Sequence, residues 1–224
     1  FYNFYKSYFW NKKRSVSYVG AKIAISNDYF TINKKDKWIT NFSSRKLAHL
    51  LRDKYDCILS SSKSINNDNS LLNCRINGLN NNKPDLFIVD MKLKLKKKLL
   101  LNSLLKKRKT YLITKKINAK KSSIYKRLGY KIILIDQLKN KNDFILLSKR
   151  IYNIGYSRLL IESGLTFLNY LLKYKLINEL YIFKSSRKLR KNGKNNDTLS
   201  HLKKIKPKLL TINLINDKLL KKEF

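Results

Sequence analysis

The segment from Trp38 to Arg75, WITNFSSRKLAHLLRDKYDCILSSSKSINNDNSLLNCR, decides the fold. Its tryptophan is expected to open a helix, and leucines at helical spacing extend that helix over Ser43–Lys54. Cys57–Leu59 then has the pattern of a short buried strand. The polar residues after it, which include Asp68, are predicted to form a loop. A helix, a strand and a polar loop in this order are typical of an α/β enzyme.

Strand-like and helix-like patterns alternate along the rest of the chain. The predicted strands are Tyr18–Ile25, Asp85–Asp90, Tyr111–Thr114, Lys131–Ile135, Arg158–Ile161, Leu180–Phe183 and Leu209–Leu214, and the further helices are Asp143–Asn153 and Gly164–Tyr174. Ser43 or Ser44 is expected to cap the first helix, and Asn142 or Asp143 the second. The alternation predicts a mostly parallel sheet with helices on its faces.

The chain is strongly basic, with 51 Lys+Arg against 14 Asp+Glu and a formal net charge of +37. Such a charge is typical of nucleic-acid-binding proteins, and the lysine-rich runs Lys92–Lys98 and Lys184–Lys194 fit that alternative. The basic residues are nevertheless spread evenly, without the stripe that a binding surface shows. Lysine and asparagine are abundant while glycine and proline are scarce, which is the composition that an A/T-biased genome produces. We therefore interpret most lysines as solvated surface charge.

Length and hydrophobic content fit a globular domain, because 224 residues of which 43% are hydrophobic can bury a substantial core. No apolar run approaches the roughly 18 residues of a membrane span, and no signal peptide is recognisable. Cys57 and Cys74 form no metal-ligand pattern or disulfide framework. This cysteine usage favours the cytoplasm and predicts no metal site.

The first 15 residues differ from the rest of the chain. Aromatic side chains crowd the first ten positions, and the basic stretch Asn11–Arg14 follows them. Aromatic residues interleaved with basic ones can stack on nucleic-acid bases. A connector that packs on a neighbouring domain or subunit is the favoured interpretation. We therefore divide the chain into a connector, residues 1–15, and one domain, residues 16–224.

Several motifs in fixed order resemble the reductase domain of the bacterial bifunctional riboflavin-biosynthesis deaminase/reductase (RibD) family. Lys22–Asp28 is similar to that family's strand end K-x-A-x-S-x-D, Trp38–Thr40 to its W-I-T, and Leu51-Arg52 to its helix end. Further along, Asp68 matches the first acid of its D-D-P, Leu72 and Arg75 match the leucine and arginine that follow, Ile161–Thr166 resembles its V-E-x-G-P-T, and Asn178–Leu180 its D-E-L. The resemblance covers roughly residues 14–185.

The resemblance implies a dihydrofolate-reductase-like α/β fold with a mostly parallel central sheet and flanking helices. It also implies NADPH-dependent reduction of 5-amino-6-(5-phosphoribosylamino)uracil, in which the ribosyl group becomes a ribityl chain. In this family the reductase follows a zinc deaminase domain, so residues 1–15 would lead from a missing N-terminal deaminase domain. The family also suggests a homodimer.

The implied substrate site rests on two arginines. Arg52 and Arg75 would clamp the substrate phosphate as permanently charged, bidentate donors, and a chain that otherwise prefers lysine retains arginine at both positions. The other implied substrate contacts are Asp36, Leu72 and Glu162. Glu162 lies at a strand end, where α/β enzymes place substrate groups. Together with Glu162, Asp68 is the implied catalytic residue, which would orient the substrate or move a proton as the ribosyl ring opens.

The implied cofactor is NADPH. Gly164 is expected to open a helix directly after a strand, and free N–H groups at such a helix start can hold a cofactor phosphate. Trp38 would pack beside the cofactor. The remaining implied cofactor contacts are Ala24, Thr40, Ser64, Asp68 and Thr166.

Two alternatives stay open beside this reductase. One is a lysine-rich nucleic-acid-binding protein. The other is a reductase-like domain that has lost catalysis and serves as an assembly partner. The second alternative fits four departures from the family's motifs, at Tyr29, Asn69, Ser70 and Leu165.

The interpretation of the charge can be tested directly. If the lysines are solvated surface charge, duplex DNA should bind weakly and without sequence preference, with a dissociation constant on the order of 10⁻⁴–10⁻⁶ M at physiological salt. Fluorescence anisotropy with several labelled duplexes at two salt concentrations measures this. A nanomolar, sequence-selective complex would favour the nucleic-acid-binding alternative.

Overall fold

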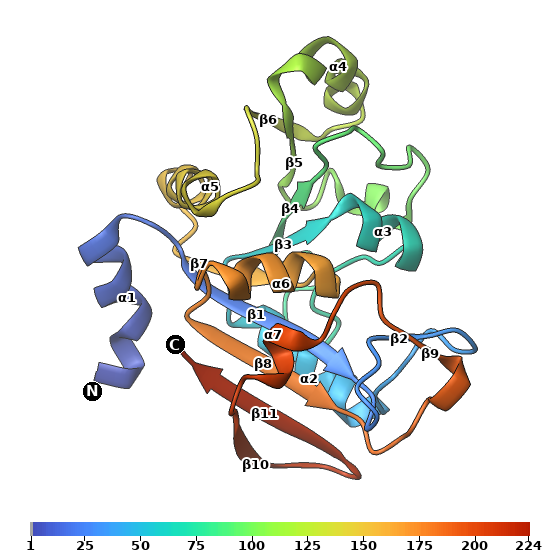
Figure 1. The fold of residues 1–224 in the computed structure, drawn as a ribbon. Coiled ribbons are helices and arrows are strands. Elements are labelled where there is room, and N and C mark those ends of the chain that lie inside the picture. The colour runs from blue at the N-terminus through green and yellow to red at the C-terminus, as the bar shows by residue number, and fades with distance from the viewer. Residues whose placement is uncertain (1) are drawn as a thin grey trace. The chain divides into compact units, whose positions relative to one another are not determined.

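The computed structural model describes residues 2–224, with side chains from Tyr5 onward, so residue 1 of the predicted connector lies outside the described residues. The chain divides into two compact units, and each unit is assembled from two separate segments. Figure 1 labels the helices and strands along the chain. Unit 1 comprises Phe1–Tyr18 and Arg52–Leu160, and unit 2 comprises Val19–Leu51 and Ile161–Phe224.

A parallel sheet forms the centre of unit 1. Its strands are β3 (Cys57–Ser61), β4 (Asp85–Val89), β5 (Thr110–Lys115), β6 (Lys131–Ile135) and β7 (Arg158–Ile161), in the order β7-β3-β4-β5-β6. The pairs β3–β4, β4–β5 and β5–β6 are all parallel. The helices are α1 (Tyr2–Arg14), α3 (Ser62–Asp68), α4 (Ala119–Arg127) and α5 (Lys141–Asn153), with short 3-10 turns η1 (Leu100–Leu104) and η2 (Lys116–Asn118).

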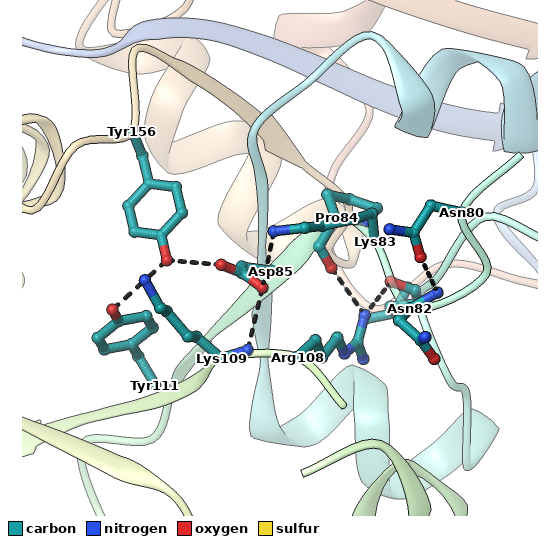
Figure 2. Close-up of polar contacts among 10 residues, drawn as sticks. Asn80, Asn82, Lys83, Pro84, Asp85, Arg108, Lys109, Tyr111 and Tyr156 are labelled. Carbon is teal, nitrogen blue, oxygen red and sulfur yellow. Dashed lines mark hydrogen bonds and ion pairs between the residues drawn. The ribbon is translucent and has the colours of Figure 1, made fainter. Parts of the chain in front are cut away.

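The core of unit 1 is aromatic, and the buried acid Asp85 lies beside it. Phe87 of β4 is fully buried, stacks on Tyr111 with ring centroids 4.4 Å apart, and meets the edge of Tyr156. Next to this cluster, Asp85 accepts hydrogen bonds from the Tyr156 hydroxyl (2.7 Å) and the Lys109 backbone N–H (3.0 Å), as Figure 2 shows. A buried carboxylate needs such donors, so they fix how β4, β5 and the residues after α5 meet.

Helix α1 is tied to unit 1 at its C-terminal end. The Asn11 side-chain amide donates to the carbonyls of Val16 (2.7 Å) and Ser157 (3.0 Å). The Trp10 ring meets the Tyr18 ring edge-on, and the Arg14 guanidinium lies over the Trp10 ring. The predicted connector is therefore a helix with its own contacts in this unit, and its role as a link to another domain stays a prediction.

Unit 2 contains a mixed sheet in the order β10-β11-β8-β1. Strand β1 (Tyr18–Ile25) runs parallel to β8 (Glu179–Lys184), while β11 (Asp217–Glu223) is antiparallel to both β8 and β10 (Lys208–Leu214). The helices are α2 (Phe42–Asp53), α6 (Leu165–Lys173) and α7 (Ser200–Lys203), with a 3-10 turn η3 (Arg190–Asn192) and a small ladder of β2 (Ile32–Asn33) and β9 (Gly193–Lys194).

The predicted α/β class with a mostly parallel sheet is confirmed, because every predicted strand is present with its ends displaced by no more than two residues. Both predicted helix caps are wrong by a few positions. Asn41, not Ser43 or Ser44, accepts from the backbone N–H of Ser44 at the start of α2. Asn140 caps α5 and forms a reciprocal capping box with Asp143, because its side chain reaches the third residue of the helix.

Two further expectations about the opening segment are corrected. Trp38 does not open a helix: it lies in the loop before α2, which begins at Phe42. Asp68 is not in a loop but is the last residue of α3, a helix that the sequence pattern did not predict because it is only seven residues long. In the described part of the chain, no helix is both long and apolar enough to cross a membrane.

The aromatic core should dominate the stability of unit 1. Phe87→Ala should lower the free energy of unfolding by about 3–5 kcal/mol, because it leaves a cavity between two aromatic rings. Ile117→Ala is the matched control, since Ile117 is 86% exposed and its truncation should change stability by less than about 0.5 kcal/mol. Urea denaturation measures both variants. Equal losses would contradict the packing described here.

Candidate active site

The sequence-predicted site residues divide between the two units. Unit 1 holds Arg52, Ser64, Asp68, Leu72 and Arg75, and unit 2 holds Ala24, Asp36, Trp38, Thr40, Glu162, Gly164 and Thr166. Within each unit the structure brings some of these side chains together through residues that the sequence did not single out.

The two predicted phosphate-binding arginines converge on one asparagine. The Arg52 guanidinium donates to the Asn73 carbonyl (2.9 Å), and the Arg75 guanidinium donates to the Asn73 side-chain oxygen (2.8 Å). Asn73 is buried, and its own amide donates to the Asn81 carbonyl (2.6 Å), so it is held in place. Two positive charges that share one small, fixed residue form a site suited to an anion such as a phosphate.

Asn73 could not be found from the sequence, since the chain is rich in asparagine and nothing marks this one. Its neighbour Leu72 is buried and has a backbone φ of 49°, in the left-handed region that a leucine rarely adopts. The Leu72 carbonyl accepts from Arg108, a buried arginine that the sequence also did not single out.

Ser64 and Asp68 lie on the short helix α3. The Ser61 side chain caps this helix, accepting from the Ser64 backbone N–H (3.2 Å) and lying 3.1 Å from the Ser64 hydroxyl. Asp68 is exposed at the other end, and Asn69 after it takes the left-handed conformation that ends a helix. Asn69, which stands where the resembling family has its second acid, therefore serves as the C-cap of α3.

In unit 2 the predicted acid Glu162 has a lysine partner. Glu162 follows β7 and is almost fully buried, and its carboxylate lies 3.7 Å from the ammonium of Lys22 on β1. The Lys22 ammonium offsets the negative charge of this buried carboxylate. Lys22 was part of a recognised motif but was not predicted as a site residue, because one lysine among so many carries no signal.

The loop before α2 orders Asp36, Trp38 and Thr40 around Arg45. The Arg45 guanidinium donates to the Thr40 carbonyl (2.7 Å) and lies 4.8 Å from the centroid of the Trp38 ring. Asp36 accepts from the Trp38 backbone N–H (3.2 Å) and lies 3.8 Å from Arg187, which offsets its charge. Trp38 is 43% exposed, so it is not a core residue.

Three predicted cofactor contacts are accessible on unit 2. Ala24 is half-buried on β1 and pairs with Phe183 of β8. Gly164 is the N-cap of the nine-residue helix α6, and both Gly164 and Thr166 are exposed. No side chain caps α6 at Gly164, and the N-terminal end of a helix favours anions.

The end of β1 is held by Asp28. Burial raises the pKa of its carboxyl, but hydrogen bonds from the Ser26 hydroxyl and from the backbone N–H groups of Leu189 and Arg190 outweigh burial and lower the pKa to about 2. Tyr29, which stands where the resembling family has glycine, has a φ of 67°. The turn thus keeps a glycine-like conformation with a tyrosine in it.

The chain is similar in sequence to a known protein family. Residues 17–189 match the family described as RibD C-terminal domain. A RibD riboflavin biosynthesis protein of Buchnera aphidicola subsp. Baizongia pistaciae (strain Bp) is 28% identical over 193 residues, which are 80% of this chain and 50% of that protein. The chain thus spans about half the length of this relative.

A second relative is shorter. The 5-amino-6-(5-phosphoribosylamino)uracil reductase of Buchnera aphidicola subsp. Acyrthosiphon pisum (strain APS) is 33% identical over 162 residues, 67% of this chain and 75% of that protein. Among solved structures, Acinetobacter baumannii RibD superposes with a TM-score of 0.80 over 98% of this chain and 61% of that one, at 19% identity. This structural likeness shows that the fold is shared.

Proposed function

We propose that this chain, which belongs to the RibD C-terminal domain family, reduces 5-amino-6-(5-phosphoribosylamino)uracil with NADPH in riboflavin biosynthesis. The observation that carries the proposal is the convergence of Arg52 and Arg75 on Asn73. The proposed substrate bears a phosphate at the end of a flexible ribosyl group. A fixed pair of guanidinium groups is what binding and orienting that phosphate requires.

Asp68 and Glu162 are the proposed catalytic residues. Reduction opens the ribosyl ring: a hydride adds to its anomeric carbon, and a proton goes to the ring oxygen that becomes a hydroxyl. In this proposal Asp68 orients the ribosyl group or moves that proton. Glu162 contacts the substrate, and the Lys22 ammonium, 3.7 Å away, offsets the negative charge of its carboxylate. Leu72 and Asp36 are the further proposed substrate contacts.

The residues present fit a nicotinamide dinucleotide, which supplies the hydride when it is bound. Gly164 is the N-cap of the nine-residue helix α6, and as a glycine it brings no side chain of its own to a phosphate at this helix end. The exposed Trp38 ring offers a face against which an aromatic group can pack. The other proposed contacts are Ala24, Thr40, Ser64, Asp68 and Thr166. NADPH is proposed over NADH because a strongly basic chain favours the extra 2′-phosphate.

The proposal extends to partners and place. The family resemblance supports an N-terminal zinc deaminase domain as the source of the substrate, with α1 as the link to it. It also supports a homodimer. A small-molecule pathway enzyme of this kind is proposed to work in the cytoplasm.

The deciding experiment is an assay of NADPH oxidation with freshly prepared 5-amino-6-(5-phosphoribosylamino)uracil. We expect turnover with ribitylamino product in amounts equal to the NADPH consumed, and a lower kcat/KM with NADH. Product identified by mass spectrometry excludes slow background oxidation. A folded chain without turnover would favour the reductase-like domain that has lost catalysis, and equal efficiency with both dinucleotides would refute the cofactor preference.

Two substitutions separate binding from chemistry. Arg75→Ala should raise KM by about 10- to 150-fold with little change in kcat, because the phosphate contact is made in both ground and transition states. Asp68→Asn keeps the shape and removes the charge, so kcat should fall by roughly 10²-fold or more while KM changes little. Steady-state kinetics on variants with the parental melting point measures both. Parental turnover in Asp68→Asn would show that Asp68 has no role in catalysis and only ends helix α3.

A further inference from the structure

Arg108 is a buried arginine to which the proposed function assigns no role. It lies just before β5 in unit 1 and is 5% exposed. Burial lowers the pKa of its guanidinium to about 10, so the group still carries its charge at neutral pH. Taking a charge out of water is costly unless fixed polar groups surround it. A buried arginine is therefore retained where its geometry is used.

The partners of Arg108 are main-chain carbonyls at the two ends of one loop. One terminal nitrogen, Nη1, donates to the carbonyls of Leu72 (2.7 Å) and Pro84 (3.0 Å), and the other, Nη2, donates to the Leu71 carbonyl. Figure 2 shows the guanidinium beside Pro84. Leu71 lies near the start of the loop that leads from α3 to β4, and Pro84 ends that loop. One planar guanidinium thus joins the two ends of this loop through hydrogen bonds in fixed directions. A lysine ammonium, at the end of a flexible side chain, cannot make the same set of bonds.

The closed loop contains a strained residue. Leu72 has a φ of 49°, which is unfavourable for a residue with a Cβ, and such conformations persist only where the surroundings fix them. The carbonyls of Leu71 and Leu72, on either side of the Leu72 backbone, both accept from Arg108. Without these bonds Leu72 is free to relax to an ordinary conformation.

Leu72 is followed directly by the anion site. The Asn73 side-chain oxygen accepts a hydrogen bond from Arg75, and the Asn73 backbone carbonyl accepts one from Arg52. A change of conformation at Leu72 redirects the Asn73 carbonyl and side chain together, and the two guanidinium groups lose their common partner. We propose that Arg108 is a positioning residue that fixes the Leu71–Pro84 loop so that Arg75 and Arg52 meet at Asn73 to receive the substrate phosphate. This inference rests on the proposed function.

The first test is a charge-removing variant of similar length. Arg108→Met should raise KM for the pyrimidine substrate by about 10- to 100-fold and leave kcat within about threefold of the parent. Arg150→Met is the matched control: the Arg150 guanidinium also donates to a carbonyl, that of Leu134 (2.6 Å), and its loss removes the same charge from unit 1. The control should keep the parental KM. A fall in kcat with unchanged KM in Arg108→Met would overturn the proposal.

A double-mutant cycle shows whether Arg108 acts through Arg75. In an Arg75→Met background, Arg108→Met should raise KM by a clearly smaller factor than in the parent, because one of the two arginines that it positions is gone. An equal fold increase in KM in both backgrounds would overturn the proposal, because it would mean that Arg108→Met acts independently of Arg75, as a general loss of structure does. If Arg108→Met does not fold, Arg108→Lys takes its place in the cycle, because it keeps the charge but not the planar guanidinium, and the same two outcomes decide.

Binding of inorganic pyrophosphate separates this inference from the proposed function. Calorimetry should show binding to the parent and to Arg150→Met, and at least tenfold weaker binding to Arg75→Met and Arg108→Met. That pattern would support the role of Arg108 even if the parent did not reduce the proposed substrate. Parental affinity in Arg108→Met, or no binding to the parent at all, would overturn it.

Discussion

Unit 2 depends on the meeting of two segments that are far apart in the sequence. Val19 and Asn178 are 159 residues apart, yet each donates its backbone N–H to the other residue, Val19 to the Asn178 side chain and Asn178 to the Val19 carbonyl, both at 2.8 Å. From there β1 and β8 pair in parallel, from Gly20 with Glu179 to Ile25 with Lys184. Because side chains alternate between faces, a slip of one residue would turn Lys22 away from Glu162.

The sequence predicts the buried strands well and the polar details poorly. An uninterrupted apolar run such as Leu86–Ile88 predicts a buried strand, and β4 is such a strand. Strand β11 was missed because its sequence, DKLLKKE, is dominated by charge. In the structure Lys221 of β11 lies 2.9 Å from both Glu179 and Glu223, and these ion pairs let a basic segment serve as a strand between β8 and β10. Such pairings are tertiary and leave no periodic signal.

The predicted site residues came from motif resemblance, and the residues that organise them did not. Lys22, Asn73 and Arg108 are common residue types in this chain, or stand at positions without a motif, so only the geometry distinguishes them. Arginine is nevertheless informative in a chain that uses so much lysine. Arg45, Arg52, Arg75 and Arg108 all donate to carbonyl oxygens or lie on rings in fixed orientations, which suits a planar group with several donors.

The interleaving of segments also sets an order of events during synthesis on the ribosome. Most of unit 1 is one continuous stretch, Arg52–Leu160, and its parallel strands can pair as soon as they emerge. Strand β1 emerges earlier but lacks its partner β8 until that strand is made. At about 5–20 residues per second, the 159 residues between Val19 and Asn178 correspond to a delay of roughly 8–30 s. Throughout that interval the edge of the apolar strand YVGAKIAI that pairs with β8 stays uncovered, and this edge is where a chaperone would act.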